Sequence, residues 1–147
     1  VSKSLPAYVN NKTTCWLVAS DPRGEGAVIA AAAFACPQRS PSLLRVYRGS
    51  KELATSDWLG RGYQPAFLNT DQLLEKLDKL QVTRVFVDLS VPPDRQQPHE
   101  RQLLTAMQLA EDSWHLAFEQ SVTRRPGVTG VLSVYQRNSP ATTNTQN

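Results

Sequence analysis

The sequence is poor in the residues that bind metals or form cross-links. It holds two cysteines and two histidines among 147 residues. There is no Cys-x-x-Cys pair and no Cys/His cluster at ligand spacing, so we expect no metal site. The longest apolar run, 26–36, is much shorter than the ~20 residues of a membrane-spanning helix. The glycine-rich nucleotide fingerprints are missing as well, and no cofactor is predicted.

Composition indicates one globular domain. Hydrophobic residues make up 40% of the chain and charged residues 20%, as in ordinary globular proteins. We expect a polar lead-in at 1–13, a single domain at 14–137 and a flexible tail at 138–147. The net charge of +3 comes without a dense Lys/Arg stripe, which argues against nucleic acid as a partner. The chain lacks an initiator methionine, so we expect a piece of a longer protein or one whose signal has been removed.

The segment from Cys15 to Cys36 has the pattern of a strand, a turn and a helix. An apolar run to Ala19 indicates a buried strand, Pro22 and two glycines indicate a turn, and the alanine-rich stretch from Gly26 indicates a helix. Strand and helix cover about 16 Å and about 15 Å, so both cysteines return to the same end of the unit. This geometry permits a disulfide between them. Two buried, unpaired thiols are the alternative.

The remaining segments predict an α/β domain. Periodicity indicates a strand at 43–48, a helix at 69–80, a strand at 84–89, a helix at 99–113 and strands at 114–120 and 131–135. The first of these strands is mixed in composition and is expected near a sheet edge. The last two are joined directly and should be antiparallel. We therefore expect a three-layer, Rossmann-like α/β domain with a mainly parallel sheet of about five strands and an antiparallel C-terminal edge hairpin.

A candidate site is expected at the carboxyl edge of this sheet, where ligands bind in open α/β folds. The ligand-binding candidates at this edge are Ser20, Asp21, Arg23, Gly24, Glu25, Gly26, Lys51, Asp57, Trp58, Arg61, Tyr63, Asp88 and His99. Asp21 or Asp88 with His99 is a conceivable acid–base pair, but a solvent-exposed position near a helix start is the favoured interpretation of His99. No nucleophile–base spacing is diagnostic and no Gly-x-Ser-x-Gly elbow occurs, so no catalytic residue is assigned.

The glycine loop has two interpretations. Backbone N–H groups around Gly24 and Gly26 are suited to an anion or to the Glu25 carboxylate. A tight turn that needs small residues is the favoured interpretation.

The segment 49–65 is expected to be a long polar loop, and long loops are often functional. Trp58 and Tyr63 beside a charged pair are suited to contact a sugar or a partner. Alternatively, Trp58 is a lid over the core and Asp57 and Arg61 form a local ion pair.

Several segments together resemble one family of membrane enzymes. They are Ser20-Asp21-Pro22-Arg23-Gly24-Glu25-Gly26, Arg48-Gly49-Ser50-Lys51, Ser56-Asp57-Trp58-Leu59-Gly60-Arg61-Gly62-Tyr63, and Pro98-His99 before Leu103-Leu104. As a set, they resemble the soluble C-terminal region of bacterial multi-pass glycosyltransferases related to the dolichyl-phosphate-mannose protein mannosyltransferases. The likeness covers roughly residues 14–136. It implies a periplasmic, extracytoplasmic domain that follows transmembrane helices of the same polypeptide. Because the catalytic carboxylates of such enzymes lie in the membrane part, none is carried over to this chain.

Two functions are therefore expected from the sequence. The first is a non-catalytic accessory domain of a membrane glycosyltransferase, which positions an acceptor protein or a glycan. The alternative is a free-standing small α/β enzyme or a phosphate- or nucleotide-binding domain that uses the cleft at the carboxyl ends of the strands. A phosphate at Gly24–Gly26 would favour the second.

Overall fold

A five-stranded mixed sheet forms the centre of the molecule. The computed structural model describes residues 13–35 and 43–139. The strands follow the order β2-β1-β5-β7-β6 across the sheet, with bounds β1 Thr13–Ala19, β2 Leu43–Arg48, β5 Val82–Asp88, β6 Trp114–Arg125 and β7 Val128–Arg137. β1 is parallel to β2 and β5, and β7 is antiparallel to β5 and β6. The predicted C-terminal edge hairpin and the edge position of 43–48 are confirmed.

Four helices accompany the sheet. They are α1 (Pro22–Ala35), α2 (Gly49–Glu52), α3 (Thr70–Lys79) and α4 (Pro98–Leu109). The start of α3 follows from its sequence, because the Asn69 side chain accepts a hydrogen bond from the Gln72 N–H at 2.9 Å, which satisfies one free donor of the first turn. Leu73 and Leu77 are its buried residues, one turn apart.

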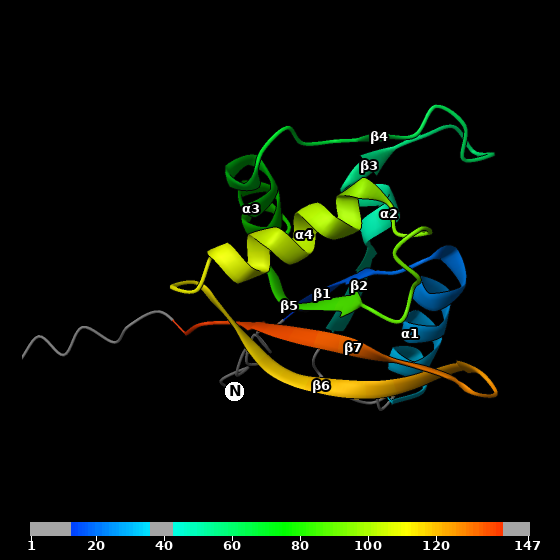
Figure 1. Ribbon diagram of the computed structural model, residues 1–147. Coiled ribbons are helices and arrows are strands. Elements are labelled where there is room, and N and C mark those ends of the chain that lie inside the picture. Colours follow the sequence, from blue (N-terminus) through cyan, green and yellow to red (C-terminus); the bar gives the residue numbers. More distant parts are fainter. Residues whose placement is uncertain (1–12, 36–42, 140–147) are drawn as a thin grey trace, which may run out of the picture.

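Core side chains lie on both faces of the sheet because residues alternate along each strand. Leu17 of β1 packs in one cluster with Leu77 of α3 and Leu103 of α4. Its neighbour Val18 belongs to a second cluster, against which Val28 of α1 packs. Helices α3 and α4 therefore cover one face and α1 lies against the other (Figure 1).

Helix α1 begins four residues earlier than the sequence predicted. The expected start at Gly26 is wrong because Asp21 caps the helix, accepting a hydrogen bond from the Gly24 N–H at 2.8 Å. Pro22 suits the first helical position because it has no N–H to leave unsatisfied. Both glycines thus lie inside the first turns of α1 rather than in a loop before it.

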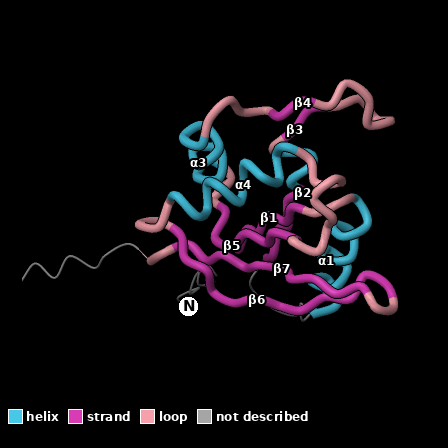
Figure 2. Tube along the Cα trace, in the orientation of Figure 1, coloured by secondary structure: helices cyan, strands magenta, loops and turns pink. Residues whose placement is uncertain are grey.

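The segment 49–65 is not one long loop. It contains α2 and two short strands, β3 (Ala54–Thr55) and β4 (Gln64–Pro65), which pair antiparallel as a separate two-stranded sheet. The sequence did not predict these elements, because each is too short to show the hydrophobic periodicity of a helix or a strand. Together they form an arm whose tip, 56–63, extends away from the main sheet (Figure 2).

Strand β6 continues beyond the predicted end at residue 120. It runs to Arg125 and pairs with β7 along its whole length, with irregularities between Leu116 and Phe118 and between Thr123 and Arg125. The turn that joins β6 to β7 consists of Pro126 and Gly127. Such bulges add a residue to one strand and redirect its side chains.

Some predictions fall outside the described residues. The lead-in (apart from Thr13, which begins β1), most of the tail, and Cys36 lie there. Cys15 is buried in β1. Its disulfide with Cys36 stays a prediction.

Candidate functional site

Asp88 is the centre of a polar cluster at the carboxyl edge of the sheet. It ends β5 and its side chain is 10% exposed. Its Oδ2 accepts a hydrogen bond from the Ser20 hydroxyl at 2.6 Å, and its Oδ1 accepts from the N–H of Ser90 at 2.9 Å and from the Ser90 hydroxyl. β1 and β5 are neighbouring parallel strands, so their carboxyl ends bring Ser20 and Asp88 together. The sequence prediction of a shared edge is confirmed for these two residues.

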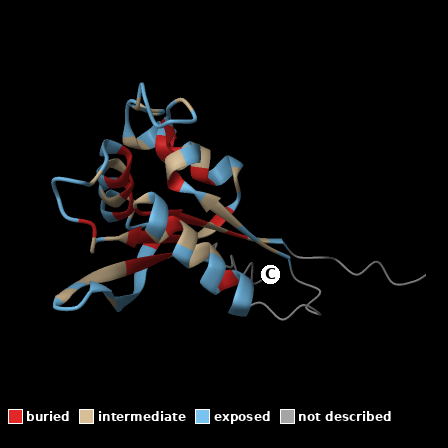
Figure 3. Cartoon of the chain, turned by 90° about the vertical axis from the view of Figure 1, so that its right-hand side faces the viewer, coloured by how far each residue is buried: buried red, intermediate tan, exposed pale blue. Residues whose placement is uncertain are grey.

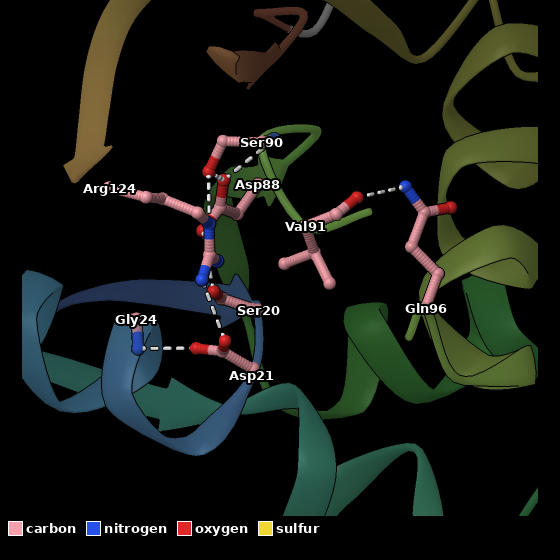
Figure 4. Close-up of polar contacts among 8 residues, drawn as sticks. All are labelled: Ser20, Asp21, Gly24, Asp88, Ser90, Val91, Gln96 and Arg124. Atoms are coloured by element: carbon pink, nitrogen blue, oxygen red, sulfur yellow. Dashed lines mark hydrogen bonds and ion pairs between the residues drawn. The ribbon is translucent and has the colours of Figure 1, made fainter. Parts of the chain in front are cut away.

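Arg124 also contacts this cluster. It lies near the end of β6, the edge strand of the sheet. Its guanidinium donates to Asp88 Oδ2 at 2.9 Å, to Asp21 Oδ2 at 2.7 Å and to the Ser90 hydroxyl at 2.8 Å (Figure 4). Arg124 lies at the second irregularity of β6, and the bulge turns its side chain toward the α1 side. Two carboxylates and one guanidinium leave the cluster with one net negative charge.

Asp21 links helix capping to this cluster. Burial raises the pKa of its carboxyl, but the hydrogen bonds from Arg124 and from the Gly24 N–H, with the positive charge of Arg124, lower that pKa by more. The net effect is a pKa below the ordinary value. Asp21 is therefore a carboxylate at neutral pH, and it occupies the position at the start of α1 where an anion would bind.

Glu25 is structural rather than available to a ligand. It is fully buried, and its carboxylate accepts hydrogen bonds from the N–H of Ser50 at 2.9 Å and from the Ser50 hydroxyl at 2.6 Å. Burial raises its pKa, against these two hydrogen bonds and the charge of Arg48. In one of the two interpretations of the glycine loop, the Glu25 carboxylate accepts from backbone N–H groups of its own loop, but it caps α2 instead. The carboxyl ends of β1 and β2 are joined in this way.

A cleft of about 470 Å³ opens beside the cluster. Its polar lining consists of Arg23, Asp88, Ser90, Thr123 and Arg124, and its apolar lining of Ala27, Val28, Val122 and Leu132, with Gly24 between them. The cleft therefore offers carboxylate, guanidinium and hydroxyl groups over an apolar floor. A ligand with several hydroxyl groups and one apolar face fits such a lining.

His99 is buried, so its predicted exposure is wrong. Its side chain is 0% exposed, and its Nδ1 is bonded to the Tyr63 hydroxyl at 2.8 Å while the His99 N–H donates to the same oxygen at 3.0 Å. Gln97 precedes α4, but its side chain makes no capping hydrogen bond. The Tyr63 hydroxyl accepts from the first turn of α4 in its place. Nδ1 pairs with Tyr63 and Nε2 has no hydrogen-bond partner among the described residues, so neither nitrogen bonds to Asp21 or Asp88 and the conceived acid–base pair is not formed. Burial lowers the pKa of His99 to about 4.

Glu100 is, like Glu25, a buried carboxyl group. It lies in the first turn of α4. It is 5% exposed and its Oε2 has no hydrogen-bond partner among the described residues. Burial raises its pKa to about 7; a hydrogen bond from the Gln97 backbone opposes that rise, and the charges of Glu25, Asp88 and Asp21 add to it. Glu100 therefore lies close enough to these carboxylates to sense their charge.

Asp57, Trp58 and Arg61 lie apart from the cluster, at the tip of the arm. Asp57 and Arg61 form the predicted local ion pair, with 2.8 Å between Arg61 Nε and Asp57 Oδ2. Trp58 is 86% exposed, so its interpretation as a lid over the core is wrong. Lys51 is exposed on α2 and has no ion-pair or hydrogen-bond partner within the described part of the chain.

Sequence reasoning missed Ser50, Ser90, Glu100 and Arg124. Ser50 and Ser90 follow β2 and β5. The carboxyl ends of parallel strands lie at one edge of a sheet, so this rule predicted their position as it did that of Asp88. Glu100 lies three residues after Gln97, the spacing of a capping box. Arg124 had no such signal, because only the pairing of β6 with β7 brings it within reach of Asp21, 103 residues away in the sequence.

The two glycines of α1 should respond in opposite ways to alanine. A Cβ at Gly24 would stand 2.8 Å from Ser20 Cβ and 3.0 Å from Asp88 Oδ2, whereas a Cβ at Gly26 would meet nothing within 4 Å. We expect Gly24→Ala to lower the free energy of unfolding by about 1–2 kcal/mol. Gly26→Ala should raise it by about 0.5–1 kcal/mol because alanine favours the helix. Urea denaturation of both variants checks this, and equal effects would contradict the close approach of α1 to Ser20.

Comparison with protein-family models, with curated proteins and with solved structures finds no match for this chain. None of the helices within 13–35 and 43–139 is long and apolar enough to cross a membrane. The same residues contain no group of three or more His, Cys, Asp or Glu side chains that could hold a metal ion. The function is therefore inferred from the geometry of the cleft.

Proposed function

We propose that this chain is a non-catalytic binding domain whose carboxyl-edge cleft takes a sugar-like, polyhydroxylated ligand. The lining of the cleft is the observation that carries this proposal. Arg23 and Arg124 present guanidinium donors, Ser90 and Thr123 present hydroxyls, and Val28 contributes to the apolar floor. Charge-assisted hydrogen bonds orient a sugar's hydroxyl groups, and the floor shelters its apolar ring face from water.

The carboxylates at the start of α1 favour a neutral ligand over a phosphate. Asp21 already accepts the Gly24 N–H there, and Asp88 is bridged to Asp21 by Arg124. A phosphate at this helix start would displace one carboxylate and meet another. The alternative of a phosphate- or nucleotide-binding domain therefore has less support than a sugar-binding one.

Catalysis by this domain alone also has little support. The Ser20 hydroxyl donates to Asp88 rather than to a histidine, and His99 is engaged by Tyr63. A nucleophile needs an adjacent base that accepts its proton, with a third group to orient that base. The described residues at the carboxyl edge offer no such chain, so the cleft is better suited to bind than to react.

The cellular setting of the proposal comes from the resemblance to membrane glycosyltransferases. We place the domain on the extracytoplasmic side of the membrane, next to transmembrane helices of the same polypeptide, where it would position a glycan or an acceptor protein. The three-layer, Rossmann-like classification is part of this proposal. It is supported by the order β1-α1-β2 with parallel strands and by helices packed against both faces.

An NMR titration of the 147-residue chain tests the binding proposal. We expect neutral hexoses and their oligosaccharides to shift the amide signals of Gly24, Ser90 and Thr123, with inorganic phosphate as the competing probe. Asp88→Asn should weaken binding by about tenfold or more, because it removes the carboxylate that holds the Arg124 guanidinium at the cleft. Asp94→Asn, at an exposed residue of the same loop, is the matched control and should bind as the native chain does. Shifts at Gly24–Gly26 with phosphate but with no sugar would favour the rival function.

A further inference from the structure

The tip of the arm, residues 56–63, presents apolar side chains to solvent. Trp58 is 86% exposed and Leu59 is 55% exposed. The arm stands clear of the buried centre of the sheet (Figure 3), so neither side chain contributes to the core. An indole group held in water on a protruding loop gives the fold no stability, and such exposed apolar pairs mark interaction sites.

Four backbone N–H groups of this tip donate hydrogen bonds within it. The N–H groups of Leu59 and Arg61 donate to Asp57 Oδ1 at 2.9 and 2.7 Å. The Asp57 N–H donates to the Arg61 carbonyl and the Gly60 N–H to the Asp57 carbonyl, both at 2.9 Å. Asp57 and Arg61 also cancel each other's charge. Fewer polar groups of the tip are therefore left to lose water when it is buried.

The side of the molecule that carries the tip is basic. The β6–β7 turn projects toward the same side as the arm, with the start of α1 between them (Figure 1). Exposed cations at this edge are Arg23, Lys51, Arg95 and Arg125. Of the acids in these edge segments, Asp21, Asp88 and Glu52 are ion-paired and Glu25 is buried, which leaves Asp94 as the exposed acid among the described residues there.

We propose that this edge docks on an anionic lipid surface, with Trp58 and Leu59 inserted at the headgroup level and the flanking cations on the phosphates. Three observations favour lipid over a protein partner. The tip protrudes from the molecule (Figure 2), four of its backbone N–H groups are bonded within it, and the exposed charged side chains of this edge are mostly positive. Tryptophan prefers the boundary between water and hydrocarbon because its ring is apolar and its N–H is polar. This inference is independent of the ligand proposed for the cleft.

Vesicle binding by the 147-residue chain tests the proposal. The probes are vesicles of phosphatidylcholine and vesicles of equimolar phosphatidylcholine and phosphatidylglycerol, with flotation and tryptophan emission as readouts. We expect partition onto the anionic vesicles, with an emission blue shift that is absent in Trp58→Ala. That variant should partition about tenfold or more weakly, given the apolar area of an indole. Arg125→Gln should partition about fivefold more weakly, since each basic side chain near the surface contributes about that factor.

The matched control is Phe34→Ala. Phe34 is 93% exposed at the other end of α1, so it is an exposed aromatic residue away from the tip, and its loss should leave partition unchanged. Far-UV circular dichroism establishes that each variant is folded. No partition of the native chain would overturn the proposal and leave a protein as the partner of the tip. Equal partition of native chain and Trp58→Ala, or an equal loss in Phe34→Ala, would overturn it as well.

Discussion

Replacing Gly130 by alanine is expected to lower the free energy of unfolding by about 2–3 kcal/mol. A Cβ at Gly130 would stand 2.5 Å from Ser90 Cα and 3.3 Å from Ser90 N. These are backbone atoms, so no rotation of a side chain relieves the overlap. The neighbouring Leu89 N–H is bonded to the Val131 carbonyl at 2.8 Å, and a shift of Ser90 would strain that bond.

The same substitution should loosen the polar cluster. Ser90 donates its N–H and hydroxyl to Asp88 and accepts from Arg124, so its displacement disturbs three contacts. Urea denaturation measures the stability, and amide shifts of Ser20 and Gly24 report the cluster. Thr129→Ala, at the exposed neighbouring position, is the control and should change stability by no more than about 0.5 kcal/mol. An equal effect in both variants would contradict the close packing of β7 on Ser90.

Glu100→Gln is expected to change how stability depends on pH. The pKa of Glu100 is about 7 in the folded protein, against an ordinary 4.5. The folded state therefore holds more protons than the unfolded state between pH 4.5 and 7, and this group lowers the free energy of unfolding as pH rises through that window. His99 acts in the opposite direction. Its folded pKa of about 4, against 6.5, makes stability rise with pH between 4 and 6.5.

In the native chain these two effects oppose each other, and a nearly flat profile is expected between pH 4.5 and 6.5. Glu100→Gln removes one of them. Its free energy of unfolding should rise by about 3 kcal/mol across that window, because each pKa displacement corresponds to roughly that energy. Above pH 7 the variant should exceed the native chain by a similar amount.

Chemical denaturation at a series of pH values measures these profiles. His99→Gln should show the reverse, a stability that falls as pH rises from 4.5 to 7. Glu111→Gln, at an exposed residue, is the matched control and should keep the native profile. Parallel profiles for the native chain and Glu100→Gln would show that Glu100 titrates normally.

The sequence by itself determined the five strands of the main sheet, the three longer helices and the edge where the site lies. Leucine spacing predicted α3 correctly because that pattern is local, and the apolar run of β5 placed Asp88 at a carboxyl end. Parallel strands share that end, so the meeting of Ser20 and Asp88 followed from topology alone. The edge hairpin followed from the direct connection of its two strands. Such conclusions need only contacts between neighbours in the chain or in the sheet.

The tertiary structure decided which polar groups are paired and which are exposed. His99 looked like a surface residue, but the arm brings the Tyr63 hydroxyl onto it and buries it. Glu25 looked available for a ligand, but α2 takes its carboxylate. Arg124 lay beyond the strand predicted at 114–120, but a bulge in β6 directs it onto Asp21 and Asp88. Each outcome depends on segments far apart in sequence, and hydrogen bonding and burial are set by that distant packing rather than by local pattern.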